Sequence, residues 1–219
     1  EADSKLTAEN VIILNSEKQQ VPSQVYQESD GTSLLLFQVS IEKGESQEFI
    51  VKAGEREDYP TKAYSRHVPE RMDDYAYENN LVAGRIYGPA LTFPKTYGSD
   101  VWVKSTDRLI IDEWFERGDY HHNYGEGMDC YQVGATLGGG ALAPCTKDGE
   151  IVIGNNWASF EHICDGAIRT KAEFTYDAIE VDGLKYSVSR TLELDANSYF
   201  VKHTTTFHPN KRSKRSRKA

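Results

Sequence analysis

Alternation of apolar and polar residues near the C-terminus constrains the fold of this chain more than any other feature. In residues 168–176, IRTKAEFTY, apolar or small side chains at every second position are separated by Arg, Lys, Glu and Thr. A period of two is typical of a β-strand with one buried face. Asp182-Gly183 follows, and an Asp-Gly pair favours a two-residue hairpin turn. Together with the strand-like segments 184–194 and 199–207, this pattern predicts a three-stranded antiparallel meander.

The second turn of this meander predicts which side chains face each other. If Ala196 and Asn197 form a two-residue loop, Arg190 lies directly opposite His203. Directly opposed side chains lie about 4.5–5.5 Å apart at Cβ, so two basic groups must share a partner or stay partly hydrated. The sequence leaves two alternatives open: a face exposed to solvent, or a concave face that binds anions.

Strand signals also dominate the rest of the chain, and helix signals are scarce. Short apolar or alternating segments predict further strands. These segments are residues 11–14, 33–41, 48–53, 81–87 and 101–104. Residues 54–75 are charged and aromatic and predict a functional loop or a short helical excursion. Residues 108–144 are rich in Gly, Asp, Tyr and His and predict a long loop lying on a scaffold. The fold class predicted is all-β and antiparallel.

Charge is unevenly distributed along the 219 residues. The net charge is −9, but the tail KRSKRSRKA holds six of the 25 basic residues, so the remainder has 19 basic against 34 acidic residues, a net charge of −15. An acidic body repels nucleic acid, and we expect no nucleic-acid partner. Residues 210–219 predict a basic disordered tail, with binding to an anionic surface as the alternative. No run approaches the roughly 20 apolar residues of a membrane span.

Three cysteines, Cys130, Cys145 and Cys164, fit no zinc-binding spacing. In an oxidising compartment Cys130 and Cys145 can pair and leave Cys164 buried. Free thiols are the equal alternative, so cysteine usage does not decide the compartment. The first residue is Glu rather than Met, which we interpret as a processed or engineered start.

A glycine-punctuated segment, DYHHNYGEGMD (119–129), concentrates residues suited to acid–base chemistry. A neutral His accepts a proton near pH 7, a carboxylate orients it, and a Tyr beside an Arg has a lowered pKa. These groups suit removal of the C5 proton of a uronic acid or opening of a sugar hemiacetal. The predicted catalytic residues are His121, His122, Tyr124 and Glu126. Adjacent histidines in a strand point to opposite faces, so we expect at most one to be catalytic.

The same segment raises the question of a metal. His121 or His122 with Glu126 and Asp129 could form a metal site. Carboxylates together with Asn and backbone oxygens would suit Ca²⁺ better than Zn²⁺. Their spacing is not diagnostic of either ion. We therefore predict no metal ligand and no cofactor, with calcium as the alternative.

The segment RMDDYAYENNLVAGRIYGPAL (71–91) has a charged first half and an apolar second half. Arginines can hold a sugar carboxylate bidentately, and aromatic rings can stack on pyranose faces. Alternatively, Arg85 is an ion-pair partner of Asp74 or Glu78. Trp114 is alternatively a residue of the hydrophobic core. The predicted substrate-binding residues are Arg71, Asp74, Glu78, Asn79, Arg85, Trp114, Arg190 and His203.

Residues 71–91, GSDVWVKSTDRLIIDEWF (98–115) and DYHHNYGEGMDCYQVG (119–134), in this order, resemble a bacterial family catalogued as domain of unknown function four-eight-six-one. The resemblance runs from about residue 64 to residue 207. It implies a fold similar to the antiparallel, galactose mutarotase-like β-supersandwich, and a secreted or periplasmic protein of polysaccharide utilisation. Asn80 departs from the family, which usually has an acid there. Family members are also longer, so the single β-sandwich domain expected over residues 1–209 is expected to be truncated at its C-terminus.

Together, the residues and the resemblance favour a carbohydrate-active protein of polysaccharide degradation. The expected partner is an anionic, uronate-containing glycan or oligosaccharide, processed by lyase, hydrolase or epimerase chemistry. The alternative is a non-catalytic glycan-binding module that uses the same arginines and aromatic residues.

Overall fold

The computed structural model describes residues 5–92 and 97–210, and in this part of the chain the fold is almost entirely β. All pairs of named strands are antiparallel, which confirms the predicted fold class. The described helices are the short α1 (Ile111–Arg117) and one 3₁₀ turn, η1 (Pro69–Arg71). Within the described residues, no helix has the length and hydropathy needed to cross a bilayer.

A five-stranded sheet forms the centre of the molecule. Its strands are β5 (Ala63–Val68), β6 (Asp74–Asn79), β7 (Val82–Ile86), β8 (Ser99–Lys104) and β9 (Gly127–Met128), in that order. The strands predicted at 81–87 and 101–104 are confirmed as β7 and β8. The loop predicted over 54–75 is wrong in its second half, which forms β5 and the start of β6. The buried face of β5 carries the small residues Ala63 and Ser65, so it gives no apolar alternation.

A four-stranded sheet contains the predicted C-terminal meander. Its strands are β10 (Ser159–Cys164), β11 (Arg169–Val181), β12 (Leu184–Asp195) and β13 (Val201–Pro209). The Asp182-Gly183 hairpin is confirmed, because Val181 pairs with Leu184 and both turn residues have positive φ, 49° and 74°. Mirror-image turns of this kind match the twist of the flanking strands.

The predicted register of β12 and β13 is wrong by two residues. Arg190 pairs with Thr205, and His203 pairs with Leu192. The ladder ends at Leu194 and Val201, and residues 196–200 between β12 and β13 form a longer loop than the two residues expected. Contacts from elsewhere hold this loop: the Ala196 amide donates to the Ile168 carbonyl at 2.7 Å, and the Asn79 side chain donates to the Ser198 carbonyl at 2.7 Å. A shift of two preserves the face of each side chain.

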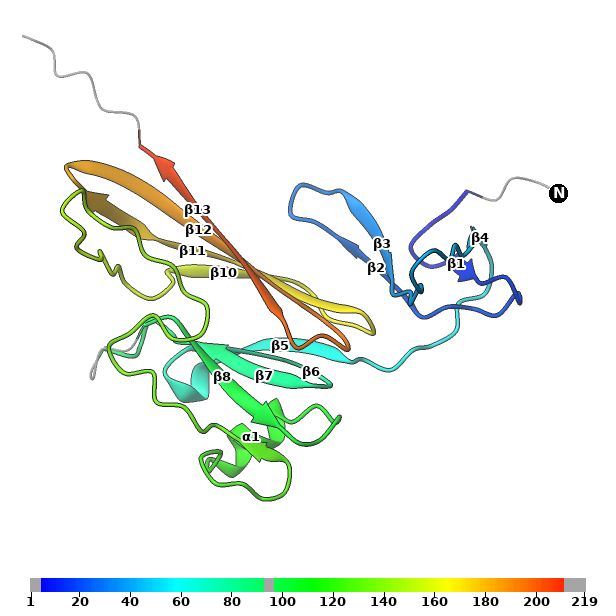
Figure 1. The fold of residues 1–219 in the computed structure, drawn as a ribbon, viewed down its shortest axis with the longest axis horizontal. Helices are drawn as coiled ribbons and strands as arrows, with labels where there is room; N and C mark the ends of the chain where they lie inside the picture. The colour runs from blue at the N-terminus through cyan, green and yellow to red at the C-terminus, as the bar shows by residue number, and fades with distance from the viewer. Residues whose placement is uncertain (1–4, 93–96, 211–219) are drawn as a thin grey trace, which may run out of the picture.

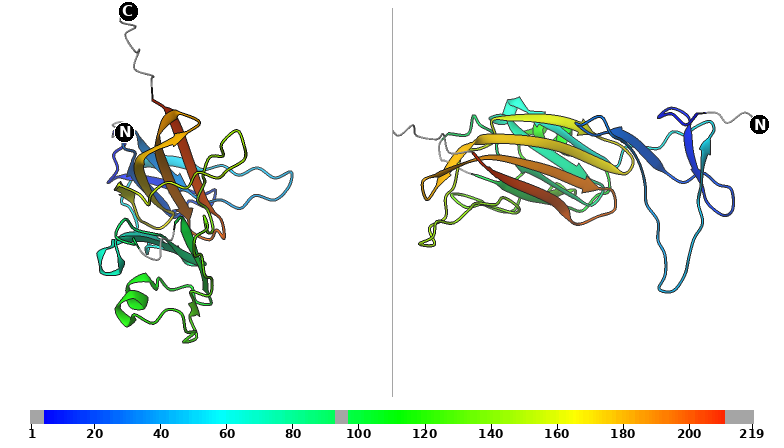
Figure 2. Two further views of the ribbon diagram at one scale, coloured as in Figure 1. Left: turned by 90° about the vertical axis from the view of Figure 1, so that its left-hand side faces the viewer. Right: turned by 90° about the horizontal axis from the view of Figure 1, so that it is seen from above.

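The two large sheets pack face to face, as Figures 1 and 2 show, with β10–β13 over β5–β8. Aromatic and aliphatic side chains from both sheets form the core between them. These residues are Tyr75, Tyr77 and Ile86 from the five-stranded sheet and Ala172, Phe174, Leu192 and Leu194 from the four-stranded sheet, with Trp157 beside them. The galactose mutarotase-like supersandwich stays a prediction.

Two smaller sheets made from the N-terminal strands lie at one end of the molecule (Figure 1). They pair β1 (Val11–Leu14) with β4 (Ile50–Ala53), and β2 (Ser23–Gln27) with β3 (Ser33–Phe37). The Gln24 side chain attaches β2 to the four-stranded sheet by accepting from the amides of Ile168 and Arg169. Strands were predicted in three of these four places. Residues 211–219 of the predicted tail lie outside the described residues, and the single domain stays a prediction.

The helix α1 lies inside the segment predicted to be a loop. Ile111, Trp114 and Phe115 are its buried residues, at the i, i+3, i+4 spacing of an amphipathic helix. Glu78 of β6 stabilises its N-terminus by accepting from the Ile110 and Ile111 amides at 2.7 and 2.8 Å. Gly118 ends it in a left-handed conformation, with φ of 73°. At seven residues the helix is too short to dominate the sequence pattern around it.

All three cysteines are free. Cys130 and Cys145 are exposed and Cys164 is buried, so the free-thiol alternative describes this structure.

Candidate functional site

Strand alternation places a row of charged side chains on the face of the five-stranded sheet that α1 covers. Arg85 of β7 pairs in register with Asp100 of β8. Asp74 lies on β6, and Asp129 directly follows β9. The residues next to these charged residues in the strands point to the opposite face of the sheet. Ile86, which follows Arg85, belongs to the core between the two sheets. A period of two therefore gives one sheet an ionic face and an apolar face.

Arg85 is the centre of this ionic cluster, with only 3% of its surface exposed. Its Nη2 lies 3.0 Å from Asp100 Oδ2 and 3.0 Å from Asp129 Oδ2, and its Nη1 lies 3.7 Å from Asp74 Oδ2. Three aromatic rings surround the guanidinium. They are Tyr87 at 5.1 Å, Tyr120 at 5.2 Å and Trp102 at 5.5 Å. Cation–π contacts at this distance stabilise a buried guanidinium.

The cluster contains more negative than positive charge. Its three carboxylates share Arg85, and Arg71 adds a second cation 3.2 Å from Asp74. Burial raises the pKa of Asp74 to about 6. Burial and the neighbouring charge of Asp100 raise the pKa of Asp129 to about 6. A carboxyl group of this kind exchanges a proton close to neutral pH, as acid–base catalysis requires.

An open cavity of about 1080 Å³ lies beside the cluster, and Arg71, Arg85, His121, Asp129 and Tyr131 are among its lining residues. His121 Nδ1 lies 3.5 Å from Asp129 Oδ2 and 3.2 Å from the Asp129 carbonyl oxygen. The His121 side chain is 62% exposed, whereas the Asp129 side chain is fully buried. Asp129 Oδ1 has no hydrogen-bond partner among the described residues. When Nδ1–H of the exposed imidazole donates to the Asp129 carbonyl, Nε2 is left to accept a proton, and the nearby buried carboxylate favours the protonated ring; this is an arrangement suited to a general base.

The turn between η1 and β6 holds Arg71 at the edge of this cavity. Met72 and Asp73 are both left-handed, with φ of 51° and 59°, a conformation that costs non-glycine residues about 1 kcal/mol or more each. Gly88 packs against the turn, where a Cβ would lie 2.0 Å from the Asp73 carbonyl oxygen. The Gly88 amide also donates to Asp74 Oδ1 at 2.9 Å. Only glycine permits this approach, so the turn and the end of β7 hold each other in place.

Of the four predicted catalytic residues, His121 alone lines the cavity. His122 packs edge-to-face against Tyr124, with ring centroids 4.8 Å apart. Tyr124 is itself held by Arg117, 4.6 Å from its ring, and donates to Asp119 at 2.8 Å. The predicted lowering of a tyrosine pKa by arginine is wrong for Tyr124, because the hydrogen bond to Asp119 raises its pKa.

Glu126, the fourth predicted residue, belongs to a surface ionic network. It accepts from Arg117 at 3.0 Å, from Trp114 Nε1 at 3.2 Å and from Arg108. The Arg117 hydrogen bond lowers its pKa, so it stays ionised. Within residues 5–92 and 97–210, no three His, Cys, Asp or Glu side chains form a group that can hold a metal.

The predicted substrate-binding residues separate into three groups. Arg71 and Arg85 line the cavity, with Asp74 next to both. The second group, Glu78, Asn79 and Trp114, is buried and has structural contacts. Glu78 contacts Lys104 and the start of α1, and Asn79 contacts the 195–198 turn. The Trp114 ring stacks on Trp102, with ring centroids 5.5 Å apart. The charged first half of 71–91, which supplied several of these predicted residues, is mostly the fully buried strand β6.

Arg190 and His203 form the third group, on the other face of the five-stranded sheet. Arg190 Nη2 donates to Ser99 Oγ at 2.9 Å, whereas Arg85 contacts Asp100, the next residue of β8. Because consecutive strand residues point to opposite faces, the sheet separates the two arginines. A single site that includes both is therefore absent from the described structure.

Asp100, Tyr87 and Tyr131 are the site residues that sequence reasoning did not select. Asp100 was detectable, because alternation in SDVWVK (99–104) places it on the same face as Trp102 and Lys104. Tyr87, which donates to Asp100 at 3.3 Å, was detectable too, because it ends the strand predicted over 81–87 and alternation places it on the face of Arg85. Tyr131 lies outside any predicted strand, and nothing in the sequence indicates its position beside Arg85.

Comparison with known proteins identifies the family but no solved counterpart. A relative from Formosa agariphila, described as "Uncharacterized protein P7", is 34% identical over 194 residues, covering 80% of this chain and 49% of the relative. The chain thus spans about half the length of that relative. No solved structure matches. The model of the family described as "Domain of unknown function (DUF4861)" matches residues 1–216, and this chain therefore belongs to that family.

Proposed function

We propose that this chain acts in polysaccharide degradation on uronate-containing glycans, by removing the proton next to the uronate carboxylate. The observation that carries the proposal is the His121–Asp129 pair, which opens onto the cavity of about 1080 Å³ with arginine at its edge. This arrangement provides a base, a group that orients the base, and a cation for an anionic substrate within one cavity.

Each step has a residue available. Arg71, with 27% of its side chain exposed, binds the substrate carboxylate and stabilises the charge that develops when the adjacent carbon loses its proton. His121 accepts that proton, and Asp129 stabilises the resulting imidazolium. The electron pair of the broken C–H bond either forms a C=C bond as the glycosidic oxygen leaves, or takes a proton from the opposite face. The first outcome is that of a lyase and the second that of an epimerase. Tyr131, 60% exposed, offers a stacking surface.

Hydrolysis by two carboxylates receives less support. Most glycosidases place two carboxyl groups on either side of the scissile bond. Asp74 and Asp100 are buried beneath the cavity, and Glu70 at its edge is paired with Arg66 at 2.7 Å. Asp129 therefore has no second free carboxyl group facing it across the cavity among the described residues.

Adjacent histidines provide a matched test. His121→Asn and His122→Asn change neighbouring residues of one loop, but only His121 contacts Asp129. On a panel of uronate-containing oligosaccharides, we expect about a hundredfold or greater loss of turnover for His121→Asn and near-normal turnover for His122→Asn. The readout is ultraviolet absorbance of an unsaturated product, with solvent deuterium incorporation for epimerisation. Equal turnover of the two variants would exclude His121 as the base.

A non-catalytic glycan-binding module is the second candidate. It is favoured by the engagement of Arg85 with three carboxylates, which leaves Arg71 and Tyr131 as the accessible polar and aromatic groups. Binding of uronate oligosaccharides without turnover, lost in Tyr131→Ala and kept in His121→Asn, would support this candidate against the enzyme.

The finer fold type and the location of the protein belong to the same proposal. The two stacked antiparallel sheets agree with a galactose mutarotase-like supersandwich, and the family resemblance implies secretion or a periplasmic location. Fractionation of the native cells, with detection by antibody, tests the location.

A further inference from the structure

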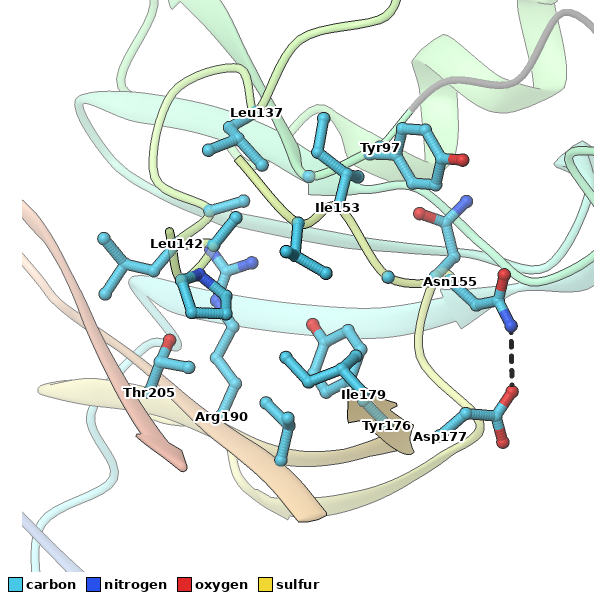
Figure 3. A pocket seen from close by; sticks show the side chains of 18 of the residues that line it. Tyr97, Leu137, Leu142, Ile153, Asn155, Tyr176, Asp177, Ile179, Arg190 and Thr205 are labelled. Carbon is cyan, nitrogen blue, oxygen red and sulfur yellow. Dashed lines mark hydrogen bonds between the residues drawn. The ribbon is translucent and has the colours of Figure 1, made fainter. Parts of the chain in front are cut away.

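A second cavity lies between the four-stranded sheet and the segment 137–156, and it reaches Ile86 on the face of the five-stranded sheet opposite Arg85. Its volume is about 60 Å³, where one water needs roughly 10–15 Å³ on the same kind of measure, so it has room for several waters or a small molecule. Figure 3 shows Arg190 and Thr205 at one side, Asn155 and Asp177 at the other, and Ile153 and Ile179 between them. The cavity is thus mainly apolar, with a cation at one end.

Arg190 brings a buried positive charge into this cavity. It is 3% exposed. Its Nη2 donates to the Gly140 carbonyl and Ser99 Oγ, both at 2.9 Å, and Nη2 and Nε lie 2.8 and 3.2 Å from His203 Nδ1. None of its hydrogen-bond partners among the described residues is a carboxylate. Burying an unpaired charge is costly, so such a group usually has an anion as its partner.

Asp177, the acid in the lining, is held elsewhere. Asn155 Nδ2 donates to Asp177 Oδ2 at 3.1 Å (Figure 3). Among the described residues, Arg190 forms its hydrogen bonds with His203, Ser99 and Gly140 and not with Asp177. The charge of Arg190 is therefore uncompensated at its own end of the cavity.

His203 holds the Arg190 side chain without neutralising it. Because Nδ1 accepts from Arg190, the imidazole is neutral and its remaining proton is on Nε2. Burial and the charge of Arg190 lower the His203 pKa to about 3, which keeps the ring neutral at physiological pH. Gly140, with φ of 139°, packs so closely against the His203 ring that a Cβ at this position would lie 2.8 Å from His203 Nε2. The guanidinium is thus fixed in position before any ligand arrives.

A second polar group at the same end lacks a partner. Thr205 lines the cavity, and its Oγ1 is buried without a hydrogen-bond partner among the described residues. Thr205 pairs with Arg190 across β12 and β13, so its hydroxyl and the guanidinium are neighbours on one face of the sheet. A hydroxyl and a guanidinium together supply the donors that a carboxylate accepts.

We propose that this second cavity binds the carboxylate of a small organic acid, with Arg190 and the Thr205 hydroxyl as its ligands. The apolar residues between the two polar ends hold the body of the acid. The site is separate from the His121 cavity, because it lies on the opposite face of β8, and it does not depend on the function proposed there. A short aliphatic acid and a free sugar acid share this chemistry.

Titration calorimetry on the whole chain tests the proposal. The probes are butyrate and glucuronate, with butanol and glucose as uncharged counterparts and sodium chloride to match ionic strength. We expect at least one acid to bind and neither uncharged counterpart to do so. Binding of butyrate alone identifies an aliphatic acid, and binding of glucuronate alone identifies a sugar acid. Absence of binding by both acids overturns the proposal.

Variants locate the binding. Arg190→Gln is expected to weaken binding about tenfold or more, and Thr205→Val about threefold to tenfold. Thr206→Val is the matched control, since Thr206 is the exposed neighbour on the other face of β13, and it should bind like the parent. If Arg190→Gln does not fold, the Thr205→Val and Thr206→Val pair decides the question. Equal binding by these two variants overturns the assignment.

Discussion

Arg85 of β7 and Arg190 of β12 are buried to the same extent, 3% exposed each. They lie against opposite faces of the five-stranded sheet. Arg85 has three carboxylates around it, whereas Arg190 has a neutral histidine, a hydroxyl and a carbonyl group. The Arg85 region therefore has excess negative charge, and the pKa values of its carboxyl groups Asp74 and Asp129 are raised to about 6. The Arg190 region has excess positive charge and no carboxylate among the described residues in contact with the guanidinium. Burial alone does not determine the function of a charged residue, because the charge balance of its neighbours decides what it can bind.

The largest effect is expected when Arg85 is removed. Arg85→Met leaves Asp74, Asp100 and Asp129 buried with Arg71 as the remaining cation of the cluster. Breaking a buried ion pair on one side costs about 3–5 kcal/mol in free energy of unfolding. Urea unfolding at neutral pH measures the loss, and adding Asp129→Asn to the same chain should recover part of it. A loss below about 1 kcal/mol would contradict the charge balance described for this cluster.

The pH dependence of the Arg85 region comes next in size. The Asp74 pKa of about 6 in the folded state exceeds its ordinary value of 3.8, so the folded state binds more protons between these values. The contribution of Asp74 to the free energy of unfolding therefore falls as pH rises through this window, by about 3 kcal/mol at most. Asp74→Asn should remove this slope. Unfolding of parent and variant measured from about pH 4 to pH 7 gives the comparison; parallel curves would show that Asp74 titrates normally.

The Arg190 region should respond to pH in the opposite direction. The His203 pKa falls from 6.5 to about 3 on folding, so the unfolded state binds the proton first. The contribution of His203 is lost as pH falls below 6.5, by about 2 kcal/mol between pH 6.5 and pH 5. His203→Gln should flatten the curve in this range. Imidazole NMR gives the His203 pKa directly, and a value near 6.5 would remove the contrast between the two regions.

Sequence patterns predicted most of the strands but not how the sheets divide the charged residues. The alternation in 168–176 and the Asp182-Gly183 turn are local, and the structure confirms both. The β12–β13 register failed because its loop is held by Ile168 and Asn79, which are distant in sequence. A turn motif contains no information about such contacts.

Contacts that are distant in sequence also limit what the sequence shows of the ionic site. In β6, DYAYEN, the charged residues are typical of a surface, yet all six residues are buried. Their partners lie outside this strand. Asp74 contacts Arg71, Arg85 and the Gly88 amide, and Glu78 contacts Lys104 and the start of α1. The sequence draws attention to these charged residues, but a single sequence does not show which face of the sheet each one occupies.

The position of Asn79 has a consequence for how the molecule opens. Its side chain, at the end of β6, donates to the carbonyls of Asp195 and Ser198 and accepts from the Leu81 and Val82 amides. One buried amide thus joins the β6–β7 hairpin of one sheet to the β12–β13 loop of the other. Cooperative units of a protein exchange their amide hydrogens together. In native-state hydrogen exchange, the ends of these two hairpins should therefore behave as one unit, although more than 100 residues separate them along the chain.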